Sequence, residues 1–165
     1  MNPVEIAIIL ASSYYGLPDG MLHAVCTVES HLNPTAIHRD DGGSNSVGLC
    51  QIKLKTAQWL GFKQDELGLY DPATNALYSA RYLKHLLTRY AGNEEKAVAA
   101  YNAGHYRACG KAACNSKYVA KVFHEWRKHD LDRSHQKRKE VQTQGWNHRV
   151  LDRKGQCGTR QCGVR

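Results

Sequence analysis

Apolar residues recur every three or four positions through most of the first 126 residues, which is the spacing of one face of an α-helix. Together with capping residues and Gly or Pro stops, this pattern predicts six helices. They fall within residues 3–15, 18–33, 55–62, 71–93, 93–104 and 116–126. Alternating strand patterns never exceed a few residues. The chain is therefore predicted to be mainly α, a compact helical domain.

An acid lies on the apolar face of the second predicted helix. Leu22, Val25 and Cys26 share that face, and Glu29 continues the series three positions later. An ionised carboxylate on a buried face costs free energy unless it is paired or neutralised, and the C-terminal end of the helix dipole also opposes its charge. Both effects raise a carboxyl pKa, as a general acid near neutral pH requires. Alternatively, the apolar face ends one residue early and Glu29 is solvated.

Positive charge is concentrated at the C-terminal end of the chain. The 165 residues carry a net charge of +8, and residues 127–165 hold 11 Lys and Arg against 4 Asp and Glu. That stretch has few apolar residues and no helical periodicity, which is typical of solvated or disordered chain. The sequence therefore predicts a helical domain over residues 1–128 and a basic, flexible tail over residues 129–165. The tail is suited to bind an anionic polymer, or it serves as a solubilising segment or linker.

No apolar run reaches the roughly 18 residues that a membrane-spanning helix needs. The apolar stretch at residues 4–16 has no Lys or Arg before it and contains Glu5, which is atypical of a signal peptide. Asn2 and Pro3 instead suit the N-cap and first position of a helix. We therefore expect no membrane span, and synthesis in the cytoplasm without a signal peptide.

Three short motifs stand in separate parts of the helical region. They are "ES" at Glu29–Ser30, "GLCQI" at residues 48–52 and "AYNAG" at residues 100–104. In this order they resemble the soluble lytic transglycosylase family, which is related to goose-type lysozyme. The flanking segments "NPTA", "DPATNALYSARYLKHLL" and "KYVAKV" are similar to that family as well. The resemblance runs from roughly residue 4 to residue 126 and implies a lysozyme-like helical fold.

The resemblance implies an enzyme that cleaves the β-1,4 bond between N-acetylmuramic acid and N-acetylglucosamine in peptidoglycan. Glu29 would protonate the bridging oxygen as general acid. It would then act as base on the sugar's own 6-hydroxyl, which closes on C1 and leaves a 1,6-anhydro end. Because this nucleophile is intramolecular and the muramyl N-acetyl oxygen can stabilise charge at C1, one carboxylate is enough. The family implies no cofactor and no metal.

The same resemblance assigns further residues to the glycan cleft. Ser30 would hydrogen-bond near the acid or the sugar, and Gln51 would bind an acetamido group. Tyr101 and Asn102 would line the cleft beside the acid, and Tyr118 would reach toward its carboxylate. Each residue also has an ordinary structural interpretation, as a helix cap, a surface amide, a core ring, a helix stop or a packed ring.

Two acids in a loop bear on the alternative of hydrolysis. Asp40 and Asp41 lie between the acid and the "GLCQ" motif, where goose-type lysozymes carry acids that help to position a water. If one of them points into the cleft, inverting hydrolysis becomes available and the chain would be a goose-type lysozyme-like hydrolase. Lys53 stands where those lysozymes place an acid, which favours the transglycosylase. The Asp–Asp–Gly–Gly run also suits an ordinary turn.

The six cysteines leave the redox state open. Cys26 and Cys50 are predicted to be buried small apolar groups. Cys50 also replaces the Met that the family usually has, and the smaller group should loosen one wall of a sugar subsite. The remaining four share one spacing in two pairs, and they are Cys109, Cys114, Cys157 and Cys162. Each pair could close a disulfide loop, all four could bind zinc, or they could be free thiols, which are at least as compatible with a chain made in the cytoplasm.

A wall-cleaving enzyme that is made in the cytoplasm needs a route to the wall. A bacteriophage supplies one, because the enzyme can ride in the virion or leave through a lysis pore. We therefore expect a phage member of the family, with virion proteins as partners. The alternative from another class is a non-catalytic virion protein that binds cell wall or nucleic acid, and the retained Glu29 argues against it.

Overall fold

Six α-helices, one 3-10 helix and five two-residue strands make up residues 2–39 and 43–150, the part of the chain that the computed structural model describes, with side chains to residue 140. The helices are α1 (Pro3–Tyr15), α2 (Met21–Ser30), α3 (Leu54–Trp59), η1 (Glu66–Tyr70), α4 (Pro72–Arg89), α5 (Glu94–Ala103) and α6 (Ser116–Val150). The strands are β1 (Ile37–His38), β2 (Ser46–Val47), β3 (Ile52–Lys53), β4 (Ala108–Cys109) and β5 (Ala112–Ala113). The prediction of a mainly α chain is confirmed.

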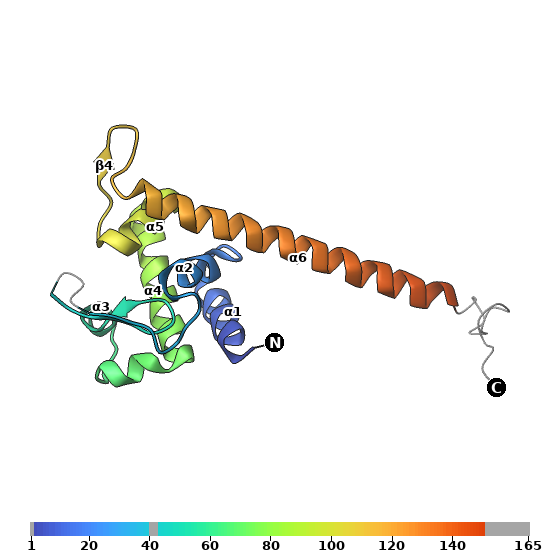
Figure 1. Cartoon of the computed structure of the whole chain (residues 1–165), viewed down its shortest axis with the longest axis horizontal. Coiled ribbons are helices and arrows are strands. Elements are labelled where there is room, and N and C mark those ends of the chain that lie inside the picture. Colours follow the sequence, from blue (N-terminus) through green and yellow to red (C-terminus); the bar gives the residue numbers. More distant parts are fainter. Residues whose placement is uncertain (1, 40–42, 151–165) are drawn as a thin grey trace. The chain divides into compact units, whose positions relative to one another are not determined.

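Helix α4 is central to the first unit of the chain, which extends to Arg127 (Figure 1). Helices α1, α2, α3 and α5 all pack against it. Ala76, Ala80 and Leu83 are fully buried on α4 and recur at helical spacing. Val25 from α2 and Val98 from α5 are equally buried and belong to the same core. Since α2, α4 and α5 share one core and α3 packs against α4, residues far apart in the sequence can meet at its edge.

Local capping signals fix the ends of α1. The side chain of Asn2 accepts a hydrogen bond from the backbone N–H of Val4 (3.0 Å), and Glu5 accepts one from the N–H of Asn2 (3.3 Å). This reciprocal capping box begins the helix. Gly16 ends it in the left-handed conformation, with φ of 57°. The helix predicted at residues 3–15 is confirmed, and the "VEIAIIL" run belongs to it.

A buried asparagine holds the turn between β2 and β3. Asn75 of α4 accepts the N–H of Cys50 (2.9 Å) and donates to the carbonyls of Val47 (2.9 Å) and Leu69 (2.7 Å). Gly48 leaves room for this amide at a φ of +76°, where a Cβ would lie 2.5 Å from the Leu69 carbonyl oxygen. Strand β2 pairs antiparallel with both β1 and β3, so the turn closes a small three-stranded sheet.

The segment between α5 and α6 is a disulfide-closed hairpin. Strands β4 and β5 pair antiparallel, and a disulfide joins Cys109 to Cys114. The sequence left a disulfide, zinc binding and free thiols open for this pair, and the structure contains the disulfide. Cys157 and Cys162 lie outside the described residues.

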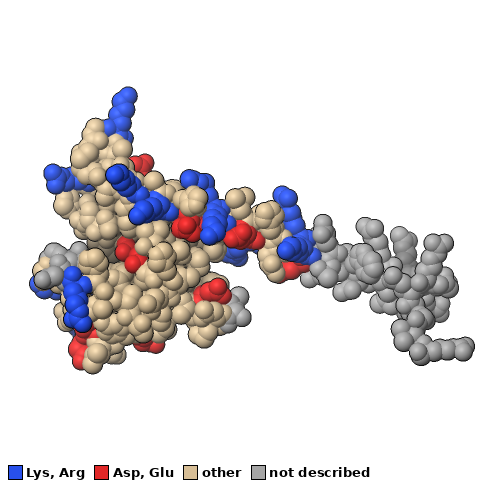
Figure 2. Space-filling view, in the orientation of Figure 1, with Lys and Arg blue, Asp and Glu red and all other residues tan. Residues whose placement is uncertain are grey.

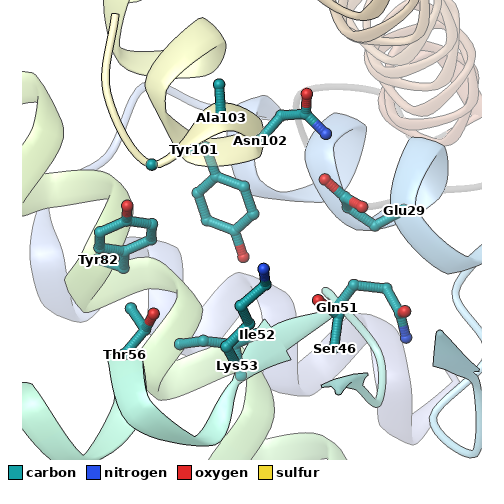
Figure 3. Close-up of a pocket in the computed structure, with 11 residues that line it drawn as sticks. Glu29, Ser46, Gln51, Ile52, Lys53, Thr56, Tyr82, Tyr101, Asn102 and Ala103 are labelled. Carbon is teal, nitrogen blue, oxygen red and sulfur yellow. The ribbon is translucent and has the colours of Figure 1, made fainter. Parts of the chain in front are cut away.

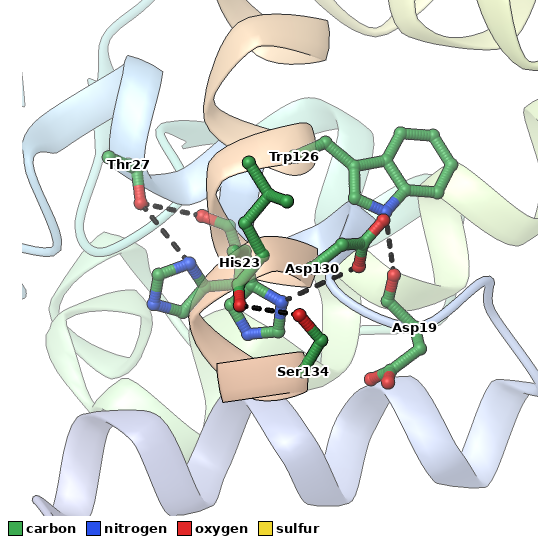
Figure 4. Close-up of polar contacts among 8 residues, drawn as sticks. Asp19, His23, Thr27, Trp126, Asp130 and Ser134 are labelled. Carbon is green, nitrogen blue, oxygen red and sulfur yellow. Dashed lines mark hydrogen bonds and ion pairs between the residues drawn. The ribbon is translucent and has the colours of Figure 1, made fainter. Parts of the chain in front are cut away.

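The start of α6 is anchored to the turn before α2. The indole Nε1 of Trp126 donates to the carbonyl of Asp19 (2.6 Å), as Figure 4 shows. Val119 and Val122 of the same helix are buried in the core. Within α2, the hydroxyl of Thr27 bonds the carbonyl of His23 one turn earlier (2.8 Å). The N-terminal part of α6 thus packs against the segment that begins the acid-bearing helix.

The second unit begins at Lys128, and its residues 128–150 continue α6. We expected no regular structure from residue 128 onward, and for these residues that prediction is wrong. The stretch has no Gly or Pro before Gly145 and is rich in Lys, Arg and Gln, which favour helix without any burial. Asp130 and Arg133, three positions apart, add an opposite-charge pair.

Residues 130–140 of this helix are exposed, and they carry both basic and acidic side chains (Figure 2). The hydroxyl of Ser134 donates to the carbonyl of Leu131 (2.7 Å). The expected solvation is present for these residues, and residues 151–165 lie outside the described part. Among the described helices, none combines the length and the apolar character needed to cross a membrane.

Candidate active site

A pocket of about 300 Å³ opens between α2, the β2–β3 turn, α4 and the end of α5. It is lined by Glu29, Ser46, Gln51, Ile52, Lys53, Thr56, Tyr82, Tyr101, Asn102, Ala103 and Gly104. Figure 3 shows the Glu29 carboxylate on one side, Tyr82 and Thr56 on the other, and the Tyr101 ring between them. The lining is mostly polar, which suits a ligand rich in hydroxyl and amide groups.

Glu29 reaches this pocket from the last turn of α2. Leu22, Val25 and Cys26 on the same face are fully buried, and Glu29 itself is half-buried. The hydroxyl of Tyr118 donates a 2.6 Å hydrogen bond to Oε1 of Glu29. Glu29 is therefore partly buried and hydrogen-bonded within the protein, rather than fully solvated beyond the end of the apolar face.

Tyr118 is held in its protonated form. Burial raises the pKa of Tyr118 well above its usual value, and the charge of Glu29 raises it further. A phenol with so high a pKa remains a hydrogen-bond donor at every physiological pH. The contact expected between Tyr118 and the acid is present.

Tyr101 forms the floor of the pocket. Its hydroxyl donates to the carbonyl of Cys50 (2.9 Å), and its ring contacts that of Tyr82, with centroids 5.4 Å apart. Burial raises the pKa of Tyr101 as well. The hydrogen bond ties the end of α5 to the β2–β3 turn across the pocket.

A disulfide between Cys26 and Cys50 joins α2 to the β2–β3 turn. Both residues are fully buried, but the prediction of two separate apolar groups is wrong. They are 24 positions apart, and no local pattern indicates their pairing, because the sulfurs meet only when α2 packs on the turn. The expected loosening of a sugar subsite at Cys50 stays a prediction. Cys26 precedes Glu29 by three residues and Cys50 precedes Gln51, so the bond links both sides of the site.

Ser30 and Gln51 bond mainly to the backbone of the site. The hydroxyl of Ser30 donates to the carbonyl of Leu49 (2.5 Å), and Ser30 is absent from the described pocket lining. Gln51 does line the pocket, at a left-handed φ of 52°. Its amide nitrogen donates to the carbonyls of Ala36 (3.1 Å) and Gly48 (2.9 Å). Ser30 thus stabilises the β2–β3 turn through its hydrogen bond, while the side chain of Gln51 lines the pocket.

Asn102 lies at the pocket rim, near Glu29 in Figure 3. Its side-chain oxygen accepts a hydrogen bond from the amide of Asn115 (3.0 Å), which also donates to the carbonyl of Ala99 (2.9 Å). The side-chain amide of Asn102 is therefore oriented by the residue that precedes α6.

Sequence reasoning missed much of the opposite wall. Thr56 and Tyr82 line the pocket because α3 packs against α4, a contact that no local pattern indicates. Lys53 was considered only as a departure from the lysozyme pattern, yet its side chain points into the pocket (Figure 3). Asn75, which holds the turn, had no sequence signal beyond a polar residue on an otherwise apolar helix face.

The two loop acids and the absence of a metal were also expected from the sequence. Asp40 and Asp41 lie outside the described residues, so a water-orienting role for them stays a prediction. In the described part of the chain, no cluster of three or more His, Cys, Asp or Glu side chains is placed to hold a metal ion.

Comparison with known proteins identifies the family. Residues 6–121 match the model of the transglycosylase SLT domain. Invasion protein IagB of Salmonella typhimurium is 29% identical over 121 residues, which cover 72% of this chain and 73% of IagB. Protein IpgF of Shigella flexneri is 31% identical over 97 residues, which cover 57% of this chain and 62% of IpgF.

Solved structures agree with the family match. One is the inactive glutamate-to-glutamine mutant of lytic transglycosylase Slt from Pseudomonas aeruginosa, with a TM-score of 0.53 and 27% identity. Another is the 70 kDa soluble lytic transglycosylase Slt70 of Escherichia coli, with a TM-score of 0.54 and 25% identity. Each match covers 61% of this chain and 16% of the much longer neighbour. The chain belongs to the transglycosylase SLT domain family and has the fold of its lytic transglycosylases.

Proposed function

We propose that the chain is a peptidoglycan lytic transglycosylase in which Glu29 serves as the one catalytic acid and base. One observation carries the proposal. Among the described residues that line the pocket, Glu29 is the only carboxylate, and the Tyr118 hydroxyl holds it by a 2.6 Å hydrogen bond. A mechanism with an intramolecular nucleophile needs no second carboxylate, whereas most glycoside hydrolases use two.

The reaction begins with a proton on the Glu29 carboxyl group. That proton passes to the oxygen that bridges N-acetylmuramic acid and N-acetylglucosamine, and the bond from C1 to this oxygen breaks. The N-acetyl oxygen of the muramyl sugar stabilises the positive charge at C1. The Glu29 carboxylate then takes the proton of the 6-hydroxyl as O6 bonds C1, which leaves a 1,6-anhydro end and restores the acid.

The surrounding groups support these two proton transfers. Tyr118 donates to Oε1 of Glu29 and so orients the carboxyl group that exchanges the proton with the substrate. Gln51 and Asn102 line the pocket with amide groups suited to acetamido substituents, and Tyr101 supplies an apolar ring below them. Ser30 and the Cys26–Cys50 disulfide act indirectly, because they fix the turn that carries Gln51.

Mass spectrometry of digested wall glycan tests the chemistry. A transglycosylase releases muropeptides that end in 1,6-anhydro-muramic acid, each one water lighter than the reducing ends left by a hydrolase. Water is present at roughly 55 M, while a well-oriented intramolecular group acts at effective molarities of about 10⁵ M or more, so the anhydro product should dominate. Mostly hydrated ends would overturn the proposal and direct attention to Asp40 and Asp41. Undigested sacculi would favour the non-catalytic binding protein.

The described disulfides support action in an oxidising compartment, since such bonds persist outside the reducing cytoplasm. Peptidoglycan is the substrate that the family membership supports. The phage setting, the virion partners and a polyanion-binding role for residues 129–165 stay predictions. Proteomic detection of the chain in purified virions would support the phage setting, and detection only in the envelope of uninfected bacteria would contradict it.

A further inference from the structure

We propose that Trp59 and His85 form an outer sugar-binding position, which extends the pocket by one place along the glycan strand. The inference rests on the proposed function, because it concerns the same substrate. It takes an N-acetylhexosamine unit as the ligand, bound by stacking of the sugar's C–H face on the indole of Trp59.

The position continues one wall of the pocket. Thr56 on α3 and Tyr82 on α4 both line that wall. Trp59 and His85 each follow three residues later on the same two helices, and their rings touch at a centroid distance of 4.8 Å. Three helical residues advance about 4.5 Å, which is close to the length of one sugar ring. The two helices therefore carry a second pair of side chains one sugar further from the pocket.

The indole is exposed in a way that suits a ligand. Trp59 is 62% exposed although it lies at the end of a short helix whose Ala57 is fully buried. The contact with His85 is T-shaped, with an interplanar angle of 82°, so it fixes the ring while most of the indole surface still meets water. An exposed, supported indole costs little conformational entropy when it binds, because it is already ordered.

The chemistry of this wall matches a polysaccharide. A pyranose presents hydroxyls around its edge and C–H groups on its face, so it needs an apolar platform flanked by polar groups. Trp59 supplies the platform, and Thr56 and His85 supply polar groups beside it. Other strongly exposed aromatic side chains lack this setting. Tyr14, for example, is 77% exposed on α1, which contributes no residue to the described pocket lining.

Binding of N-acetylglucosamine oligomers of increasing length tests the inference. Calorimetry is performed on the full chain with Glu29→Gln, alone and combined with Trp59→Ala. The expected result is unchanged affinity for the disaccharide and about tenfold weaker binding of the longest oligomers, as loss of one buried ring face implies. Trp59→Tyr should restore most of the affinity, and Tyr14→Ala should lose none.

The outcomes separate this inference from the proposed function. Equal affinity of the Trp59→Ala variant for every oligomer, or an equal loss at every length, overturns the outer position even if wall digestion yields anhydro ends. A length-dependent loss supports it even if the digestion yields hydrated ends, because the binding measurement needs no catalysis. Circular dichroism confirms that each variant is folded before its affinity is compared.

Discussion

One segment, residues 26–39 and 43–53, and another, residues 128–140, are held in place by different kinds of interaction. In the first stretch, Cys26, Leu49 and Cys50 are fully buried, and a disulfide joins parts of the chain 24 residues apart. In the second stretch, residues 130–140 are exposed, and Leu131 is 61% exposed. Long-range contacts fix the first segment, whereas local helix propensity is enough for the second. Substitutions in the two segments should therefore have very different effects.

The largest effect is expected at the acid that the first segment positions. Glu29→Gln keeps the shape and an acceptor for Tyr118 but removes the transferable proton. Wall clearance should fall by at least about 100-fold, the lower range for loss of a general acid. Turbidity of purified sacculi measures clearance, and thermal unfolding should show an unchanged or slightly higher midpoint. Retained clearance above a few per cent of the wild-type rate would contradict the single-acid mechanism.

A large loss of stability is expected when the disulfide of the first segment is removed. Replacing Cys26 and Cys50 by Ala should lower the free energy of unfolding by about 3.5 kcal/mol, and the same change at Cys109 and Cys114 by about 2 kcal/mol, because the second loop is shorter. Urea titration measures both. Wall clearance should fall mainly in the first variant, since only that bond joins the acid's helix to the turn at Gln51. Equal loss of clearance in both variants would mean that the Cys109–Cys114 hairpin matters for catalysis as much as the Cys26–Cys50 bond does.

These differences also explain what the sequence could predict. The N-cap of α1 at Asn2 and the apolar face of α2 that leads to Glu29 are local patterns, and both were predicted correctly. The Cys26–Cys50 bond and the hydrogen bond from the Cys50 N–H to Asn75 join residues 24 and 25 positions apart, so they depend on packing that no window of sequence contains. The role of Thr56 and Tyr82 in the pocket depends on packing in the same way.

The second segment was mispredicted for the opposite reason. Its low apolar content predicts chain without regular structure. Burial, however, contributes to the tertiary stability of a helix and not to the intrinsic helix propensity of its residues. Family resemblance supplied Gln51, Tyr101, Asn102 and Tyr118, which the helical patterns alone would not have selected. Neither the helical patterns nor the family resemblance selected Trp59, because it lies beside His85 only once α3 and α4 are packed.

A smaller effect is expected from the hydroxyl that touches the acid. Tyr118→Phe removes a donor to the Glu29 carboxylate but keeps the ring in place, so clearance should fall about tenfold. A hydrogen bond to an ionised carboxylate favours the ionised form, so the activity profile of the variant should extend to higher pH. The pH dependence of sacculus clearance measures this shift. Tyr106→Phe, a ring outside the pocket lining, is the control, and an unshifted profile for Tyr118→Phe would mean that the contact is only structural.

A cap on the central helix gives a modest and pH-dependent effect. Hydrogen bonds from the hydroxyl and the N–H of Thr74 lower the pKa of Asp71 below its usual value of 3.8. Stabilisation by this carboxylate is therefore complete above its unfolded pKa and is lost as the pH falls through the lower folded pKa. Asp71→Ala should cost about 1 kcal/mol at pH 7, and this cost should shrink in strong acid. Urea titration of Asp71→Asn, which keeps an acceptor without a charge, should show a smaller loss at pH 7.

The smallest effect on folding is expected from removal of the second segment. Truncation after Arg127 keeps Val119, Val122 and the bond from Trp126 to Asp19, which are the contacts that anchor α6 within the first unit. The remaining chain should therefore keep its helicity and its unfolding midpoint and should still cleave soluble glycan fragments. Attachment to intact walls should weaken, more at low salt than at high salt, because salt screens exposed charges. A sedimentation assay at two ionic strengths measures attachment. Failure of the truncated chain to fold would mean that residues beyond Arg127 stabilise the first unit. The second segment would then not be held by local helix propensity alone, and the contrast between the two segments would be lost.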